Sequence, residues 1–205
     1  MPTFVIHEAI AKKINEKYNF EELPFLIGSV APDSWHCAKH FGNENRLMFH
    51  FQKTDKDLDG CDKFYEKYKN FMDNPFYVGY YIHLLTDVYF KKFVYPKYHY
   101  LINSSENIYK YHGVIKMIDL LHYKLIKKYN IEEINNFNEF NMDSILIDEF
   151  DMSGLQDDII YMNKIISTAK EEKEIIKFED ITKDVENATT YVLDNLEKIM
   201  VKVRK

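Results

Sequence analysis

Residues 74–90 of this 205-residue chain read NPFYVGYYIHLLTDVYF, and Asp87 is the only charged residue among them. Mostly large side chains recur here at spacings of four and three, at Phe76, Tyr80, His83, Asp87, Phe90 and Val94. Because an α-helix turns by about 100° per residue, these positions share one helix face. The many tyrosines and the central carboxylate disfavour a transmembrane span. The pattern therefore predicts a helix buried inside a soluble protein.

A carboxylate buried on that face needs a partner, and His83 lies one turn before Asp87. The i, i+4 spacing aims an imidazole and a carboxylate at one cation. No lysine or arginine lies within a turn on that face before Lys91. The alternative is that Asp87 is a core acid hydrogen-bonded to tyrosines, with His83 as its neighbour. Both interpretations remain open, and the first makes this helix half of a candidate metal site.

The composition favours one all-α domain over residues 1–205. The chain is 46% hydrophobic and 16% aromatic, which is typical of a packed core, and its length suits one such core. Its 6 glycines and 5 prolines leave little material for the turns of an all-β fold. We expect a metal-site half at about 1–95 and helices that cover the core at about 104–205.

The net charge of −6 disfavours high-affinity binding to a nucleic acid duplex or to anionic membranes. We expect no transmembrane segment. The two cysteines, Cys37 and Cys61, form no CxxC motif and give little reason to expect an oxidising compartment. The N-terminal residues do not read as a signal peptide, so we expect a cytoplasmic protein.

Two earlier segments add further candidate ligands. Residues 3–18 read as an amphipathic helix with His7 on its buried stripe, where a histidine is more often a satisfied core group than a ligand. Residues 23–35 read as a short helix that ends in a turn at Pro32-Asp33, and Asp33 suits the cap of the next segment. His36, His40 and His50 come soon after it. Histidines crowded near an acid are the composition that a metal site needs.

The second half of the chain predicts three more helices. The first carries a second, weaker constellation at His112, Asp119 and His122, whose spacings of seven and three allow a shared face, and we assign no chemistry to the other two. Ser104 or Ser105 would cap a helix running to about residue 129. Ser153 would cap a helix over residues 155–170, and Asp180 or Thr182 would start a terminal helix through residue 201. We expect the last two to cover the core.

Four stretches, IHEAIAKKI, FLIGSVAPDSWH, MFHFQ and FYVGYYIHLLTDVYF, resemble in order and separation the bacterial zinc-dependent phospholipase C family, which is related to the single-strand-specific zinc nucleases. The resemblance covers roughly the first half of the chain. It implies an all-helical fold of the phospholipase C type with a polynuclear zinc site. Asp33, His50, His83 and Asp87 would hold one zinc ion. His7 would help to hold a second, with Asp87 bridging.

The chain departs from that family after the central helix. Position 93 is phenylalanine, and His99, His112 and His122 are not followed four residues later by glutamate. We therefore expect one or two zinc ions and predict that these three histidines are not ligands. A terminal amine that binds metal, as in the secreted members, would require removal of the initiator methionine to expose Pro2.

These observations predict a zinc-dependent hydrolase of phosphate esters, with phosphodiesters as the expected class. The substrate would be a small phosphate ester or a phospholipid head group. Asp33 would be the catalytic general base if it is not a ligand. The alternatives are a non-catalytic helical protein with a structural or sensory metal site, and a metal-free interaction module.

Overall fold

The computed structural model of the protein describes residues 2–37, 43–102 and 107–203. Over these residues it is all-helical and has no strand, which confirms the predicted class. The α-helices are α1 (Phe4–Tyr18), α2 (Glu22–Val30), α3 (Asn43–Phe49), α4 (Gly60–Tyr68), α5 (Pro75–Tyr89), α6 (Tyr95–Tyr98), α7 (Asn107–Asp119), α8 (His122–Tyr129), α9 (Leu155–Thr168) and α10 (Phe178–Val203). None of the described helices is long and apolar enough to cross a membrane.

Helix α5 is the centre of the fold, as its sequence predicts. Asn74 caps it, because its side-chain oxygen accepts a hydrogen bond from the backbone N–H of Phe76 at 3.0 Å. Pro75 occupies the first turn, where its missing N–H costs nothing. Every side chain from 76 to 88 is buried. Such complete burial needs neighbours on all sides.

Helix α2 packs directly on α5 through two glycines. A Cβ atom at Gly28 would overlap the carbonyl oxygen of Phe76, and one at Gly79 would overlap that of Phe25. The two backbones therefore approach more closely than side chains would allow. Because the 3-10 helix η1 (Ala31–His36) follows α2 without a loop, this contact places η1 beside α5 as well.

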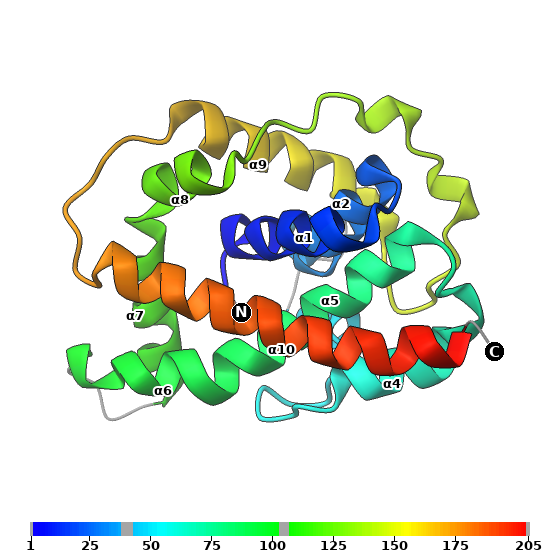
Figure 1. Cartoon of the computed structure of the whole chain (residues 1–205), viewed down its shortest axis with the longest axis horizontal. Helices are drawn as coiled ribbons and strands as arrows, with labels where there is room; N and C mark the ends of the chain where they lie inside the picture. Colours follow the sequence, from blue (N-terminus) through cyan, green and yellow to red (C-terminus); the bar gives the residue numbers. More distant parts are fainter. Residues whose placement is uncertain (1, 38–42, 103–106, 204–205) are drawn as a thin grey trace.

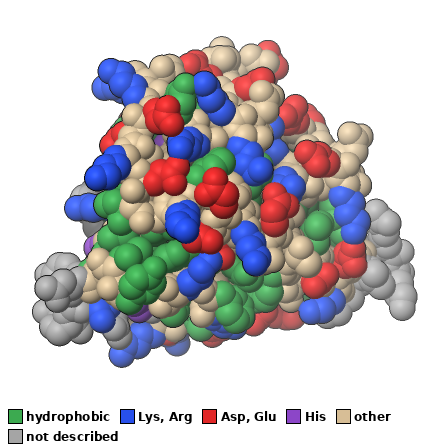
Figure 2. Space-filling model, turned by 60° about the vertical axis from the view of Figure 1, so that its left-hand side comes forward, with side chains coloured by type: hydrophobic (Ala, Val, Ile, Leu, Met, Phe, Trp, Pro, Cys, Tyr) green, Lys and Arg blue, Asp and Glu red, His purple; other side chains and the backbone are tan. Residues whose placement is uncertain are grey.

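The remaining helices enclose this pair. Helix α10 lies across α1 and α5 and contacts both (Figure 1). Helix α4 packs on α5, α8 packs on α1, and α9 packs on η1. Asp184 of α10 accepts hydrogen bonds from Lys97 at 3.0 Å and from the hydroxyl of Tyr98 at 2.8 Å. This contact ties α10 to α6. Figure 2 shows one face of the molecule, on which basic and acidic side chains are interspersed.

Three predicted boundaries in the second half differ from the structure. The helix expected through residue 129 is interrupted at Leu121, which is fully buried and separates α7 from α8. Its expected caps Ser104 and Ser105 lie outside the described residues. Ser153 does not cap α9, because Gly154 precedes that helix and the N–H of Ser153 is bound by Asp151. Helix α10 begins at Phe178, earlier than expected, because Ile181 and Val185 already pack in the core.

Candidate metal centre

The structure brings all five candidate ligands together from four segments. His7 comes from α1, Asp33 from η1, His50 from the residue after α3, and His83 and Asp87 from α5. Four of these side chains are at most 1% exposed, whereas that of Asp33 is 16% exposed. The prediction that these five side chains converge is therefore confirmed. Asp33 is the member of the cluster that is exposed to solvent.

Backbone carbonyls orient two of the histidines. The Nδ1 atom of His50 lies 2.7 Å from the carbonyl oxygen of Arg46, and that of His83 lies 2.8 Å from the carbonyl oxygen of Ser29. A carbonyl only accepts, so each Nδ1 carries the proton and donates it. In the neutral ring each Nε2 atom then carries a free lone pair that points into the cluster. This is the usual arrangement of a metal-bound histidine.

These inward atoms have the spacing of a tetrahedral ligand set. His50 Nε2 lies 3.2 Å from His83 Nε2 and 3.5 Å from both Asp33 Oδ1 and Asp87 Oδ2. His83 Nε2 lies 3.9 Å from Asp33 Oδ1. With zinc bonds of about 2.0–2.2 Å, the edges of a tetrahedron are roughly 3.3–3.6 Å. The three separations from His50 are close to these edges. The donor atoms of Asp33, His50 and His83 all lie within 4.8 Å of one another, and so do those of His7, His83 and Asp87.

The other oxygens of both carboxylates face His7. Its Nε2 atom lies 3.7 Å from Asp87 Oδ1 and 3.9 Å from Asp33 Oδ2. Its ring is stacked on that of His83, with centroids 3.6 Å apart and an interplanar angle of 5°. Each carboxylate thus turns one oxygen to His50 and the other to His7. This arrangement suits two cations bridged by carboxylates.

The electrostatics of the cluster favour a cation. Burial, and then the neighbouring His83, lower the pKa of His7 to about 3, and burial lowers the pKa of His83. Burial alone would raise the pKa of both carboxylates, but His83, His50 and His7 hold that of Asp33 below its ordinary value, and the charge of the N-terminal amine, followed by His50 and His83, does the same for Asp87. At neutral pH His7 and His83 are therefore uncharged and both carboxylates ionised. A buried pair of like charges is costly unless a cation compensates it.

Several atoms of the cluster also lack hydrogen bonds within the described residues. Both ring nitrogens of His7, both carboxylate oxygens of Asp87 and Oδ1 of Asp33 are buried without a partner. The alternative in which tyrosines bond to Asp87 is not supported, since neither of its carboxylate oxygens accepts a hydrogen bond from any of the described residues. Buried orphan atoms in one place are the expected sign of a missing ligand.

A cavity of about 760 Å³ opens beside the cluster, and Asp33 is part of its wall. Its other charged residues include Arg46, Lys56, Lys91 and Lys92. Apolar and aromatic side chains make up much of the remainder, namely Pro2, Phe4, Trp35, Leu58, Tyr95, Ile115, Tyr161 and Met162. The cavity therefore offers a partly apolar space with basic groups next to the carboxylates.

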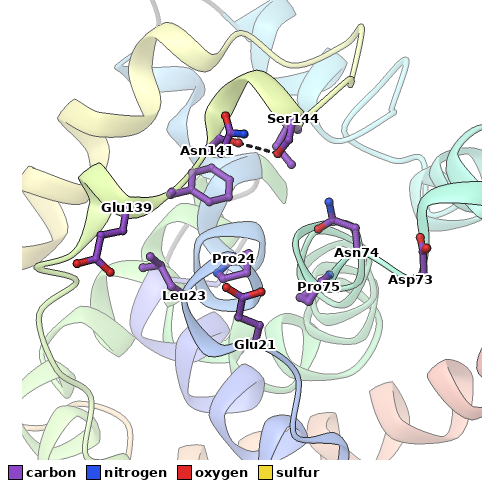
Figure 3. Close-up of a pocket in the computed structure, with 11 residues that line it drawn as sticks. Glu21, Leu23, Pro24, Asp73, Asn74, Pro75, Glu139, Asn141 and Ser144 are labelled. Atoms are coloured by element: carbon purple, nitrogen blue, oxygen red, sulfur yellow. Dashed lines mark hydrogen bonds between the residues drawn. The ribbon is translucent and has the colours of Figure 1, made fainter.

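A second cavity, of about 410 Å³, lies at the start of α2 and α5 (Figure 3). Carboxylates of Glu21, Asp73 and Glu139 line it, together with prolines and amides, and it contains no histidine. None of the five cluster residues lines it, whereas Asp33 lines the larger cavity, so the larger cavity is the one that serves the candidate centre.

The remaining histidines do not join the cluster. Within the described residues, no group of three or more ligand-type side chains includes His99, His112 or His122. His122 lies 3.3 Å from Asp119 of the preceding turn, and His112 lines the cavity. His40 lies outside the described residues. That His99, His112 and His122 are not ligands stays a prediction.

Sequence reasoning missed the contribution of α9. The sequence predicts only that this helix covers the core, but its Asp158 is 2% exposed and lies 2.8 Å from His36 Nε2. Asp157 and Asp158 stand in the first turn of α9, where acids usually interact with the helix dipole and face solvent. Only the packing of α9 on η1 distinguishes the buried acid from its exposed neighbour.

Comparisons with protein-family models, with curated proteins and with solved structures found no match to this chain.

Proposed function

We propose that this protein is a zinc-dependent hydrolase of phosphate esters, with phosphodiesters as its substrate class. The observation that supports it most is the pair of imidazole Nε2 atoms, on His50 and His83, which face each other at 3.2 Å beside two carboxylates. Two lone pairs at that distance repel each other unless a cation or a proton lies between them. The distances from His50 to the other three donor atoms fit zinc, and the family resemblance of the first half of the chain points to the same ion.

Asp33, His50, His83 and Asp87 would hold one zinc ion, and His7 with the second oxygens of the carboxylates would hold another. Bound zinc lowers the pKa of a coordinated water and neutralises charge on phosphoryl oxygens. The protein contributes the orientation. The carbonyls of Arg46 and Ser29 fix two ring tautomers, and η1 presents the Asp33 carboxylate at the cavity wall.

The cavity suits an anionic ester with an apolar part. Lys91 and Lys92 supply positive charge near the cluster, and Lys91 is held by a hydrogen bond of 3.1 Å to Gln52. Aromatic side chains offer an apolar surface for the rest of the molecule. Asp33 is the most exposed carboxylate of the cluster, so if it is not a zinc ligand it would be the group that accepts a proton from an attacking water.

Turnover of an aryl phosphodiester tests this proposal. We expect zinc-loaded protein to hydrolyse it, a chelator to abolish the reaction, and added zinc to restore it. His50→Gln should lose more activity than the roughly 10–100-fold that mutating an outer-shell partner of a metal costs. His99→Gln, a histidine outside the cluster, is the matched control and should keep full activity.

Zinc bound at the expected ratio without turnover of any phosphate ester would contradict the hydrolase and favour a structural or sensory metal site. No bound zinc at all would contradict both and leave an interaction module.

A further inference from the structure

A second group of ligand-type side chains lies at the end of η1. His36, Cys37 and Asp158 each offer one donor atom, and these atoms all lie within 4.8 Å of one another. His36 and Cys37 are adjacent in the chain, whereas Asp158 comes from α9. None of the three belongs to the five-residue cluster described above. The packing of α9 on η1 is what brings them together.

The ring of His36 is oriented in the same way as those of His50 and His83. Its Nδ1 atom lies 2.5 Å from the carbonyl oxygen of Asp33, to which it donates, and its Nε2 atom faces Asp158 Oδ1 at 2.8 Å. At 2.8 Å these two atoms share a proton, and the hydrogen bond to Asp158 raises the pKa of His36. A cation at this position would replace that proton and move the two donor atoms slightly apart.

Asp158 is a buried carboxylate with few sources of compensating charge. It is 2% exposed, and burial raises its pKa. An ion pair with protonated His36 compensates the charge at one oxygen of Asp158. It does not explain why the thiol of Cys37 also lies within 4.8 Å of both groups. Burial, together with Asp158 and Asp157, raises the pKa of the Cys37 thiol to about 11, so the thiol is protonated unless a cation replaces its proton.

We propose that His36, Cys37 and Asp158 form a further divalent-metal site on the wall of the large cavity. One imidazole, one thiolate and one carboxylate are donors that zinc accepts together, and the two anionic donors balance a divalent charge. Binding releases the thiol proton, and the imidazolium proton where present, to solvent. Three protein ligands leave a fourth position open.

The location gives this site a role in substrate binding. His36 and Asp158 line the same cavity as Asp33, and the carbonyl of Asp33 holds the His36 ring. A phosphate ester in the cavity would therefore be within reach of Asp33 and of the second site's His36 and Asp158. The site itself stands on its own donors, whether or not the larger cluster hydrolyses a substrate.

Cobalt binding under reducing conditions tests the site through its sulfur donor. Metal-free protein titrated with Co²⁺ is expected to develop a near-ultraviolet thiolate-to-cobalt charge-transfer absorption, whose final intensity corresponds to one cobalt–thiolate bond per chain. The five-residue cluster has no sulfur, so this absorption reports the second site alone. Asp158→Asn should raise the Co²⁺ concentration needed for half-saturation by roughly tenfold or more.

The chain provides a matched control, since Cys37 and Cys61 are its two cysteines and neither is bonded to the other. Cys37→Ser should abolish the absorption and Cys61→Ser should keep it. Asp87→Asn should also keep it, which separates this site from the proposed hydrolytic centre. Wild type without the absorption, or Cys37→Ser with the full absorption, would overturn the proposal.

Discussion

Replacing Asp87 by asparagine is expected to abolish the stabilisation that zinc gives this protein. Both oxygens of Asp87 face histidine nitrogens, at 3.7 Å from His7 and 3.5 Å from His50. A neutral amide cannot supply the charge that offsets two cations. Zinc bound only to the native state at about 100 times its dissociation constant adds about 2.7 kcal/mol. For a chain of this size, each kcal/mol shifts Tm by about 2–4 °C.

The wild type should therefore lose roughly 5–11 °C in Tm when zinc is removed under such conditions. Asp87→Asn should melt near or above the stripped wild type and respond little to added zinc, because the amide removes the cost of a buried charge. Thermal unfolding followed by circular dichroism, with and without zinc, measures both effects.

Asp184→Asn is the matched control for this experiment. Asp184 is also a buried aspartate, but Lys97 and Tyr98 satisfy it, far along the chain from the cluster. That variant should have a lower Tm than the wild type, but zinc should still raise its Tm by as much as it raises that of the wild type. If Asp87→Asn gained the same increment, Asp87 would not be a ligand, and the metal centre built on α5 would have to be abandoned.

Replacing Gly79 by alanine should weaken both the fold and the metal centre. The added methyl group would overlap the carbonyl oxygen of Phe25 and lie 2.8 Å from the backbone nitrogen of Ser29. Both atoms belong to the backbone of α2, so the helix itself must move. Overpacking of this kind costs about 1–3 kcal/mol, which corresponds to roughly 2–12 °C in Tm.

The displacement should also reach the ligands. The carbonyl of Ser29 orients His83, and η1 carries Asp33 directly after α2. We therefore expect Gly79→Ala to bind zinc more weakly as well as to melt earlier, as measured by calorimetric titration and thermal unfolding.

Gly113→Ala is the control for helix propensity, because a methyl group there meets only the side chain of Ile102, whose end can move aside. It should be neutral or slightly stabilising, with unchanged zinc affinity. Gly79→Ala protein with wild-type Tm and zinc affinity would show that the close contact of α2 and α5 does not position the centre.

The helical class and the central helix follow from the sequence alone. The spacing of apolar positions in residues 74–90, the proline at 75 and the asparagine before it act within one or two turns of chain, and the observed α5 matches them. The same local pattern placed His7, His83 and Asp87 on buried faces, and the structure agrees. Periodicity determines which side of a helix is buried, because burial of that side stabilises the helix.

Periodicity does not determine which buried faces meet. His7 and His83 are separated by 76 positions, and their stacked contact exists because α1 and α5 pack on each other and on a shared neighbour, α2. The division of residues 107–129 into two helices depends on burying Leu121, which no local signal demands.

Asp158 shows the difference most clearly. From the sequence it is one of two adjacent acids in a first helical turn, and both would interact with the helix dipole equally well. The packing of α9 on η1 buries one of them beside His36. The sequence by itself thus determined the helices and the types of residue on their buried faces. The tertiary structure alone decided which acids and histidines share a site, because that depends on contacts between segments far apart in the chain.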